Sequence, residues 1–153
     1  MSLKGCRDMI ETCFKKMYPE LSFECEEALI GGIKIISKGV VKSRGQDNKL
    51  SFTAHIGEIP GADLPYLVSM YFDFGTLGRT AENFELMNQF NTTVPYFKCG
   101  ISEVGYFTLY WTVPTSSAKA VVNIITSGIN MICNMNKEDS LLKKLTARTN
   151  GSY

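Results

Sequence analysis

The chain has 153 residues, of which 44% are hydrophobic and 20% charged, and sixteen lysines and arginines stand against fifteen aspartates and glutamates. These values fit one ordinary globular domain and exclude collagen-like, coiled-coil and natively disordered chains. A net charge of +1 supplies no overall field for nucleic acid or an anionic membrane, so binding to either would depend on a local patch.

Two hydrophobic periods divide the chain into predicted helices and strands. Apolar residues at steps of three and four predict helices, and strict alternation of apolar with polar residues predicts strands with one wet face. Between the first helix and the first strand lies an acidic connector at residues 20–27. In chain order we expect a helix at 3–17, an extended run through residue 44, strands at 50–56 and 68–74, a helix at 80–91, strands at 96–101 and 106–113, a long helix from 115 or 116 to 135, and a short helix around 141–145.

This order, α-β-β-β-α-β-β-α, predicts an α+β fold with a five-stranded antiparallel sheet and helices mainly on one face. We expect a single domain over residues 1–146 and a flexible tail over 147–153. The long helix is about as long as a bilayer-crossing segment, but Asn123, Asn130 and Asn134 argue against insertion into a membrane.

The cysteines and the histidine indicate neither a metal site nor a disulfide framework. The five cysteines form no Cys-x-x-Cys pair, and the single histidine, His55, has no cysteine near it in sequence. Cys6, Cys13 and Cys133 lie on apolar helix stripes, which favours small buried hydrophobes in a reducing compartment, the cytoplasm. We expect no cofactor.

The central helix and the strands after it resemble a known family. The segment Leu86-Met87-Asn88-Gln89-Phe90-Asn91, followed by Tyr96-Phe97-Lys98 and the strand from Tyr106 to Val113, resembles the YbjN-like family, described as bacterial sensory transduction regulators. The wider fold is similar to that of type III secretion chaperones, which are usually strongly acidic, unlike this chain. The resemblance implies a compact protein-binding domain, often dimeric, without catalytic residues.

Within that motif, Asn88 and Asn91 are the positions that the resemblance carries over as partner-binding candidates. An alternative role is structural, because an asparagine near a helix C-terminus can satisfy free carbonyls or adopt a left-handed turn.

One face of the predicted sheet is rich in tyrosine and threonine, which is typical of protein interfaces. We expect this face to bind a partner or a second copy of the chain, and the alternative is an ordinary strand exterior. Its members are Thr53, His55, Tyr71, Tyr96, Tyr106, Thr108, Tyr110 and Thr112.

Two basic features are candidates for binding nucleic acid or an anion. Lys34, Lys38, Lys42 and Arg44 share one side of the first strand, where the alternative is a solvated edge strand. Arg79 follows a glycine-containing loop at the start of the central helix, which could hold an anion, although its spacing does not match a P-loop and a plain turn into a capped helix is the alternative.

These patterns together predict a non-catalytic protein-binding module, a chaperone-like or regulatory adaptor that acts in the cytoplasm as a homodimer. His55 has no nucleophile or orienting carboxylate assigned to it, so we expect no enzyme. The alternative function is a nucleic-acid or small-ligand binding domain that uses the basic hairpin.

Overall fold

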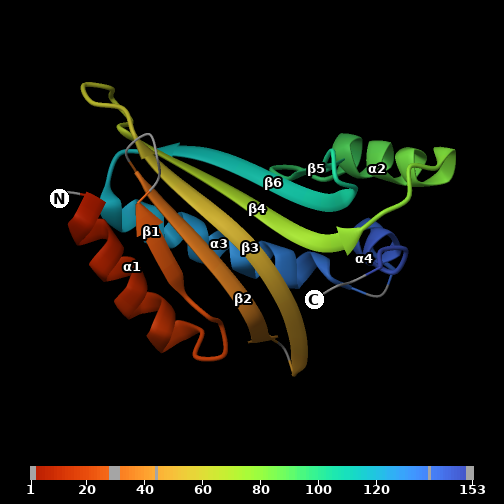
Figure 1. Ribbon diagram of the computed structural model, residues 1–153, viewed down its shortest axis with the longest axis horizontal. Coiled ribbons are helices and arrows are strands. Elements are labelled where there is room, and N and C mark those ends of the chain that lie inside the picture. Colours follow the sequence, from red (N-terminus) through yellow and green to blue (C-terminus); the bar gives the residue numbers. More distant parts are fainter. Residues whose placement is uncertain (1–2, 28–31, 44, 138, 151–153) are drawn as a thin grey trace.

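Antiparallel strands form one curved sheet, and a long helix runs behind it (Figure 1). The computed structural model describes residues 3–27, 32–43, 45–137 and 139–150. Within them the elements in chain order are α1 (Leu3–Met17), β1 (Glu24–Glu27), β2 (Ile33–Ser43), β3 (Gln46–Glu58), β4 (Tyr66–Thr76), α2 (Ala81–Thr93), β5 (Lys98–Ile101), β6 (Tyr106–Thr115), α3 (Ala118–Met135) and α4 (Leu141–Thr146).

The strand order is β1-β2-β3-β4-β6-β5, and each neighbouring pair is antiparallel. The α+β class with an antiparallel sheet is confirmed, but the prediction of five strands was wrong, because the described residues form a sheet of six. The additional strand, β1, has the sequence Glu-Cys-Glu-Glu, a composition with weak strand propensity. It forms because pairing with Ile33–Ile36 of β2 satisfies its backbone groups.

Aromatic rings pack across the inner face of the sheet and join it to α1. Phe14 of α1 lies 6.1 Å from Phe52 of β3, and Phe52 lies 5.3 Å from Phe72 of β4, measured between ring centroids. Phe97 continues the series at 6.0 Å from Phe72 and 5.5 Å from Trp111 of β6. The four phenylalanines are fully buried and Trp111 is half-buried, so one face of the sheet is the core face, as the alternating pattern predicts.

Helix α3 crosses the inner face against β3, β4 and β6, and it also contacts α1. Gly128 brings the α3 backbone close to the sheet, since a Cβ atom there would lie 2.7 Å from the sulfur of Met70 and 2.9 Å from the ring of Trp111. Ser117 caps the helix by accepting a hydrogen bond from the Ala120 N–H. No helix in the described part of the chain has both the length and the apolar character needed to cross a membrane.

Helix α2 lies at the β5 end of the sheet, where it contacts β5 and α4 (Figure 1). The helical period predicts Ala81, Phe84, Met87 and Phe90 as its buried stripe, but only Met87 and Phe90 are buried. The two N-terminal positions of the stripe are exposed because β5 and α4 cover a narrower part of the helix than a whole sheet would.

The described residues after α4 return to the sheet. The sequence predicts a loose tail from residue 147, whereas Asn150 pairs with Thr76 at the end of β4 through backbone hydrogen bonds of 2.9 and 3.4 Å. Arg148 reaches α2, where it forms an ion pair with Glu82 at 3.0 Å. The described residues 147–150 are therefore in contact with the domain.

Gly39 provides a test of how β2 meets the connector before β1. Its φ is +151°, and a Cβ atom there would lie 2.1 Å from the carbonyl oxygen of Glu20. We expect Gly39→Ala to lower the free energy of unfolding by about 2–4 kcal/mol, because the methyl group overlaps backbone and the φ is unfavourable for alanine. Urea denaturation measures this change, with Gly57→Ala as the control, since nothing lies within 4 Å of a Cβ atom at Gly57. Equal stability of the two variants would contradict the close approach.

Cys99 of β5 predicts a dependence of stability on alkaline pH. Burial between β5 and α2 raises the pKa of the Cys99 thiol to about 11, above its usual value. The folded protein therefore keeps this proton while the unfolded chain loses it, so stability present at neutral pH falls as the pH rises through 9 towards 11. Thermal unfolding between pH 8 and 11 should show a smaller decline for Cys99→Ala than for the unaltered protein. Parallel declines would contradict this assignment.

Candidate functional site

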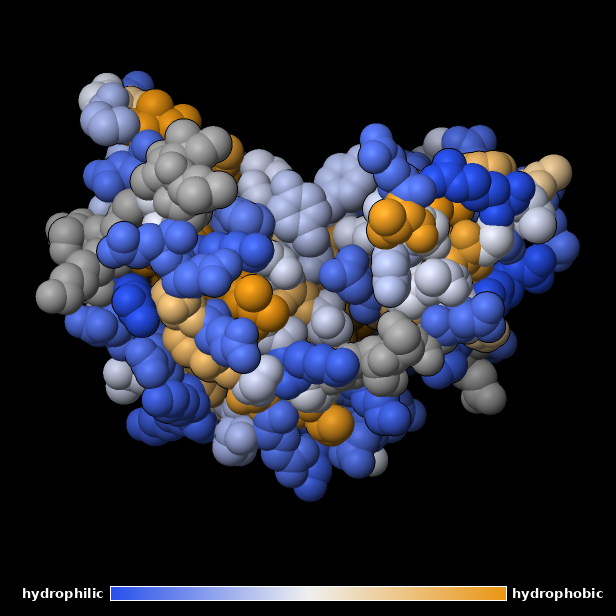
Figure 2. Space-filling view, in the orientation of Figure 1, coloured by the Kyte–Doolittle hydropathy of each residue, from blue (hydrophilic) through white to orange (hydrophobic). Residues whose placement is uncertain are grey.

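The face of the sheet opposite α1 and α3, which we call the open face, is covered by no helix of the described residues and faces the viewer in Figures 1 and 2. Its surface in Figure 2 dips between the β3–β4 hairpin at the upper left and α2 at the upper right. Strand alternation directs polar side chains to this side, because the apolar positions of the same strands are buried on the other.

The strand register arranges the open-face side chains in rows that cross the strands. Thr112 donates a hydrogen bond to Ser69 at 3.2 Å within one row, and Thr108 donates one to Asp73 at 2.9 Å within another. The rows are Lys34, His55, Ser69 and Thr112; then Ile36, Thr53, Tyr71, Tyr110 and Lys98; then Lys38 and Ser51 of β2 and β3, continued by Asp73 and Thr108 of β4 and β6.

Three of the four candidate tyrosines lie on this face. Tyr71 and Tyr110 face each other across β4 and β6, and the His55 ring lies edge-on to Tyr71 with centroids 6.0 Å apart. Tyr106 lies at the end of β6, opposite Thr76. Tyr96 lies before β5 begins, with a φ of +73° and an exposed fraction of 71%, so it is not part of the strand rows.

The two asparagines of α2 have different surroundings. The side-chain amide of Asn91 bonds the backbone of Cys99 twice: its oxygen accepts from the Cys99 N–H at 2.8 Å, and its nitrogen donates to the Cys99 carbonyl at 3.1 Å. Asn91 therefore occupies the outer edge of β5 as a neighbouring strand would. Asn88 is exposed, and its carbonyl accepts a hydrogen bond from Thr92.

This difference predicts unequal effects of two matched substitutions. We expect Asn91→Ala to lower the free energy of unfolding by about 1–3 kcal/mol, because it removes two hydrogen bonds and leaves backbone groups of β5 unpaired. Asn88→Ala should change it by less than about 0.5 kcal/mol, as exposed substitutions usually do. Chemical denaturation of both variants measures the difference. A neutral Asn91→Ala would mean that the amide is available for a partner.

Two of the four residues of the predicted basic stripe pair with acidic side chains. Lys34 lies 3.5 Å from Glu26, and Lys42 lies 3.5 Å from Glu20. Lys38 is exposed on the same side of β2, and Arg44 lies outside the described residues. The alternative interpretation of this stripe as a solvated edge was wrong about the edge, since β1 and β3 flank β2. The acidic neighbours came from the connector and the unpredicted strand.

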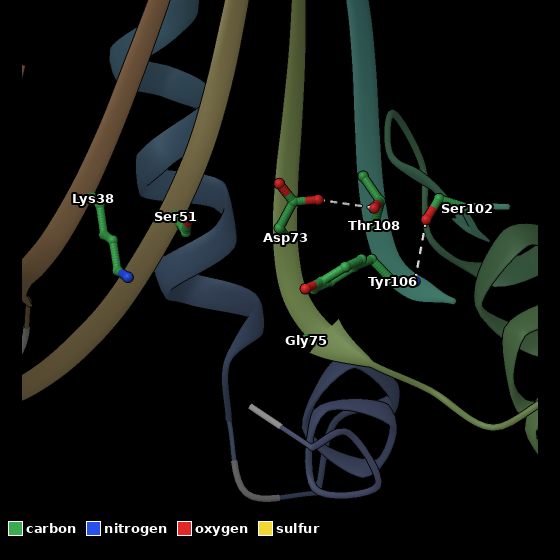
Figure 3. Close-up of a pocket in the computed structure, with 7 residues that line it drawn as sticks. All are labelled: Lys38, Ser51, Asp73, Gly75, Ser102, Tyr106 and Thr108. Carbon is green, nitrogen blue, oxygen red and sulfur yellow. Dashed lines mark hydrogen bonds between the residues drawn. The ribbon is translucent and has the colours of Figure 1, made fainter. Parts of the chain in front are cut away.

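A cavity of about 290 Å³ opens on the open face between β2 and the end of β6 (Figure 3). It lies at a β-bulge, because three residue steps on β4, from Asp73 to Thr76, pair with only two steps on β6, from Thr108 to Tyr106. Gly75, with a φ of +95°, accommodates the bend. The lining residues are Lys38, Ser51, Asp73, Gly75, Ser102, Tyr106 and Thr108.

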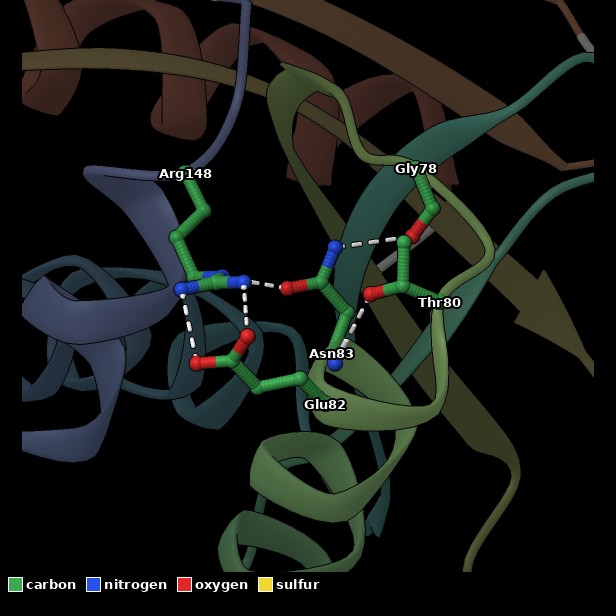
Figure 4. Close-up of polar contacts among 5 residues, drawn as sticks. All are labelled: Gly78, Thr80, Glu82, Asn83 and Arg148. Atoms are coloured by element: carbon green, nitrogen blue, oxygen red, sulfur yellow. Dashed lines mark hydrogen bonds and ion pairs between the residues drawn. The ribbon is translucent and has the colours of Figure 1, made fainter.

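The loop predicted as an anion site has other contacts in the structure. Arg79 donates a hydrogen bond to the carbonyl of Ser102 at 2.8 Å, so its guanidinium holds the β5–β6 turn. Thr80 caps α2 through the Asn83 N–H, and the Asn83 side chain donates to the Gly78 carbonyl at 2.8 Å (Figure 4). Arg148 contacts both Asn83 and Glu82. These contacts favour the capped turn.

Sequence reasoning missed the cavity. Asp73 lies in the predicted strand at 68–74, and Gly75 lies just after it in the predicted loop, whereas β4 continues to Thr76. An isolated glycine in a strand is the available signal of a bulge. Among the described residues, no group of three or more histidine, cysteine, aspartate or glutamate side chains could hold a metal ion.

No family model and no curated protein matches the chain. Membership of the YbjN-like family therefore stays a prediction. Among solved structures, the chain is similar to the crystal structure of the Yersinia pestis type III secretion chaperone SycH in complex with a stable fragment of YscM2. The similarity covers 87% of this chain and 98% of that chain, at 13% sequence identity and a TM-score of 0.41. These values are too low to support an argument about function.

Proposed function

We propose that this protein is a non-catalytic protein-binding module that binds its partner through the open face. The observation that carries the proposal is the uncovered sheet surface on which Tyr71, Tyr106 and Tyr110 are exposed by 39%, 38% and 43%. Tyrosine combines a large rigid contact area with a hydroxyl group, and it loses little conformational entropy on binding. A sheet face with three such residues among short hydroxyl side chains is suited to binding the surface of another protein.

The resemblance to the YbjN-like family implies the more specific role of a chaperone-like or regulatory adaptor, and we include that role in the proposal. We also propose that the chain works in the cytoplasm as a homodimer. The free thiols of Cys13, Cys25, Cys99 and Cys133 are consistent with a reducing compartment.

The alternative, a nucleic-acid site on β2, has weaker support. Glu26 and Glu20 neutralise part of the lysine stripe, and the chain as a whole is balanced in charge. Catalysis has weak support too, since the neighbours of His55 in its row are Lys34 and Ser69, and the carboxylate at the β1 end of that row, Glu26, pairs with Lys34.

The double variant Tyr71→Ser, Tyr110→Ser tests the open face. We expect it to weaken self-association or partner binding by at least about tenfold, because central interface tyrosines contribute on the order of 1–2 kcal/mol each. Sedimentation equilibrium measures self-association, and quantitative affinity capture compares the retained proteins. Val104→Ser, in the β5–β6 turn, is the control, since Val104 is an exposed apolar residue away from the rows.

Both variants should keep the unfolding midpoint of the unaltered protein within a few degrees, because the altered side chains lie on the surface. An unchanged dimerisation constant together with an unchanged set of captured proteins would refute the role of the open face.

A further inference from the structure

We propose that the cavity at the β4 bulge binds the guanidinium group of an arginine side chain presented by the partner protein. This inference rests on the proposed function and specifies one residue of the partner. It follows from the charge of Asp73, the position of Tyr106 and the size of the cavity.

Asp73 supplies the negative charge. Its side chain is half-buried on the open face, and one carboxylate oxygen accepts the hydroxyl hydrogen of Thr108 at 2.9 Å. In the described part of the chain, Asp73 takes part in no ion pair. A carboxylate that is partly withdrawn from water and held in one orientation is a strong acceptor for a planar cation, because a guanidinium can donate two parallel hydrogen bonds to it.

Tyr106 supplies a ring and a hydroxyl group beside that charge. It enters from the end of β6, past the point where the bulge shifts the register. In Figure 3 its hydroxyl group points towards the β4 side of the cavity, the side of Asp73 and Gly75. An arginine gains from both groups, since its guanidinium stacks on aromatic faces as well as pairing with carboxylates. The more compact lysine ammonium pairs with the carboxylate but does not stack on the ring in the same way.

The volume of the cavity fits one side chain. At about 290 Å³ it has room for one side chain and lies at the lower limit of the usual range of small-molecule sites, about 300 Å³. Lys38 lines the opposite end, two strands and therefore roughly 10 Å from Asp73 along the sheet. This separation keeps the ammonium group of Lys38 away from the Asp73 end, where the guanidinium binds.

The test uses the full chain and a capped arginine as the probe. ¹H–¹⁵N NMR spectra are recorded during titration with N-acetyl-arginine methylamide and, separately, with its neutral isostere, N-acetyl-citrulline methylamide. We expect saturable shifts at the amides of Asp73, Gly75, Tyr106 and Thr108 with the arginine probe and none with the citrulline probe. The lysine analogue should bind several-fold more weakly.

Two variants assign the effect. Asp73→Asn keeps the shape of the side chain and the acceptor for Thr108 but removes the charge. It should lower the affinity for the arginine probe by at least about tenfold. Asp63→Asn makes the same change at an exposed position outside the cavity and should bind as the unaltered protein does. If Asp73→Asn is poorly folded, Tyr106→Leu replaces it, with an expected loss of several-fold.

Equal shifts with the citrulline probe, full binding by Asp73→Asn, or no shifts at the cavity would overturn the inference. So would preferential binding of N-acetyl-aspartate methylamide around Lys38, which would make the cavity an anion site. Failure here is distinct from failure of the open face: loss of association in the Tyr71→Ser, Tyr110→Ser variant would leave the proposed function standing without an arginine in the cavity.

Discussion

The packing of one face of the sheet against α1 and α3 determines the rest of the structure. Phe52, Phe72 and Phe97 occupy that interface with Phe14 and Trp111. A slip of one residue in β3, β4 or β6 would turn the ring of Phe52, Phe72 or Trp111 towards water. Since burial of each large ring stabilises the fold by about 1.5–3 kcal/mol, the register is strongly specified. The tyrosines and hydroxyl side chains of the other face are therefore brought together by the packing of the core.

The sequence predicted those elements whose residues carry a clear period. The alternation in β3, β4 and β6 was sufficient to separate the two faces, and the apolar stripe of α3 located that helix. β1 was missed because its glutamates have weak strand propensity, and its pairing with β2 is a tertiary effect. The alternation of Leu21, Phe23 and Cys25 was the available hint. The number of buried residues in the apolar stripe of α2 was overestimated, because the helix packs only against β5 and α4.

The candidate site was only partly accessible to the same reasoning. The alternation of side chains along each strand placed Tyr71 and Tyr110 on one face. It could not show that the chain turns at Tyr96 before β5 begins. Pairing of Lys34 and Lys42 with glutamates depends on the path of the connector, which lies outside any local period. The cavity depends on a register shift between β4 and β6, and such a shift is a property of two strands together.

The side chain of Asn91 has a consequence for how copies of this protein can assemble. Because its amide occupies both backbone positions of Cys99 at the outer edge of β5, that edge cannot template the strand of another molecule. Growth of the sheet from one molecule to the next, the route to fibrils, is closed on this side. Assemblies that form through the open face instead are finite, since each molecule has one open face.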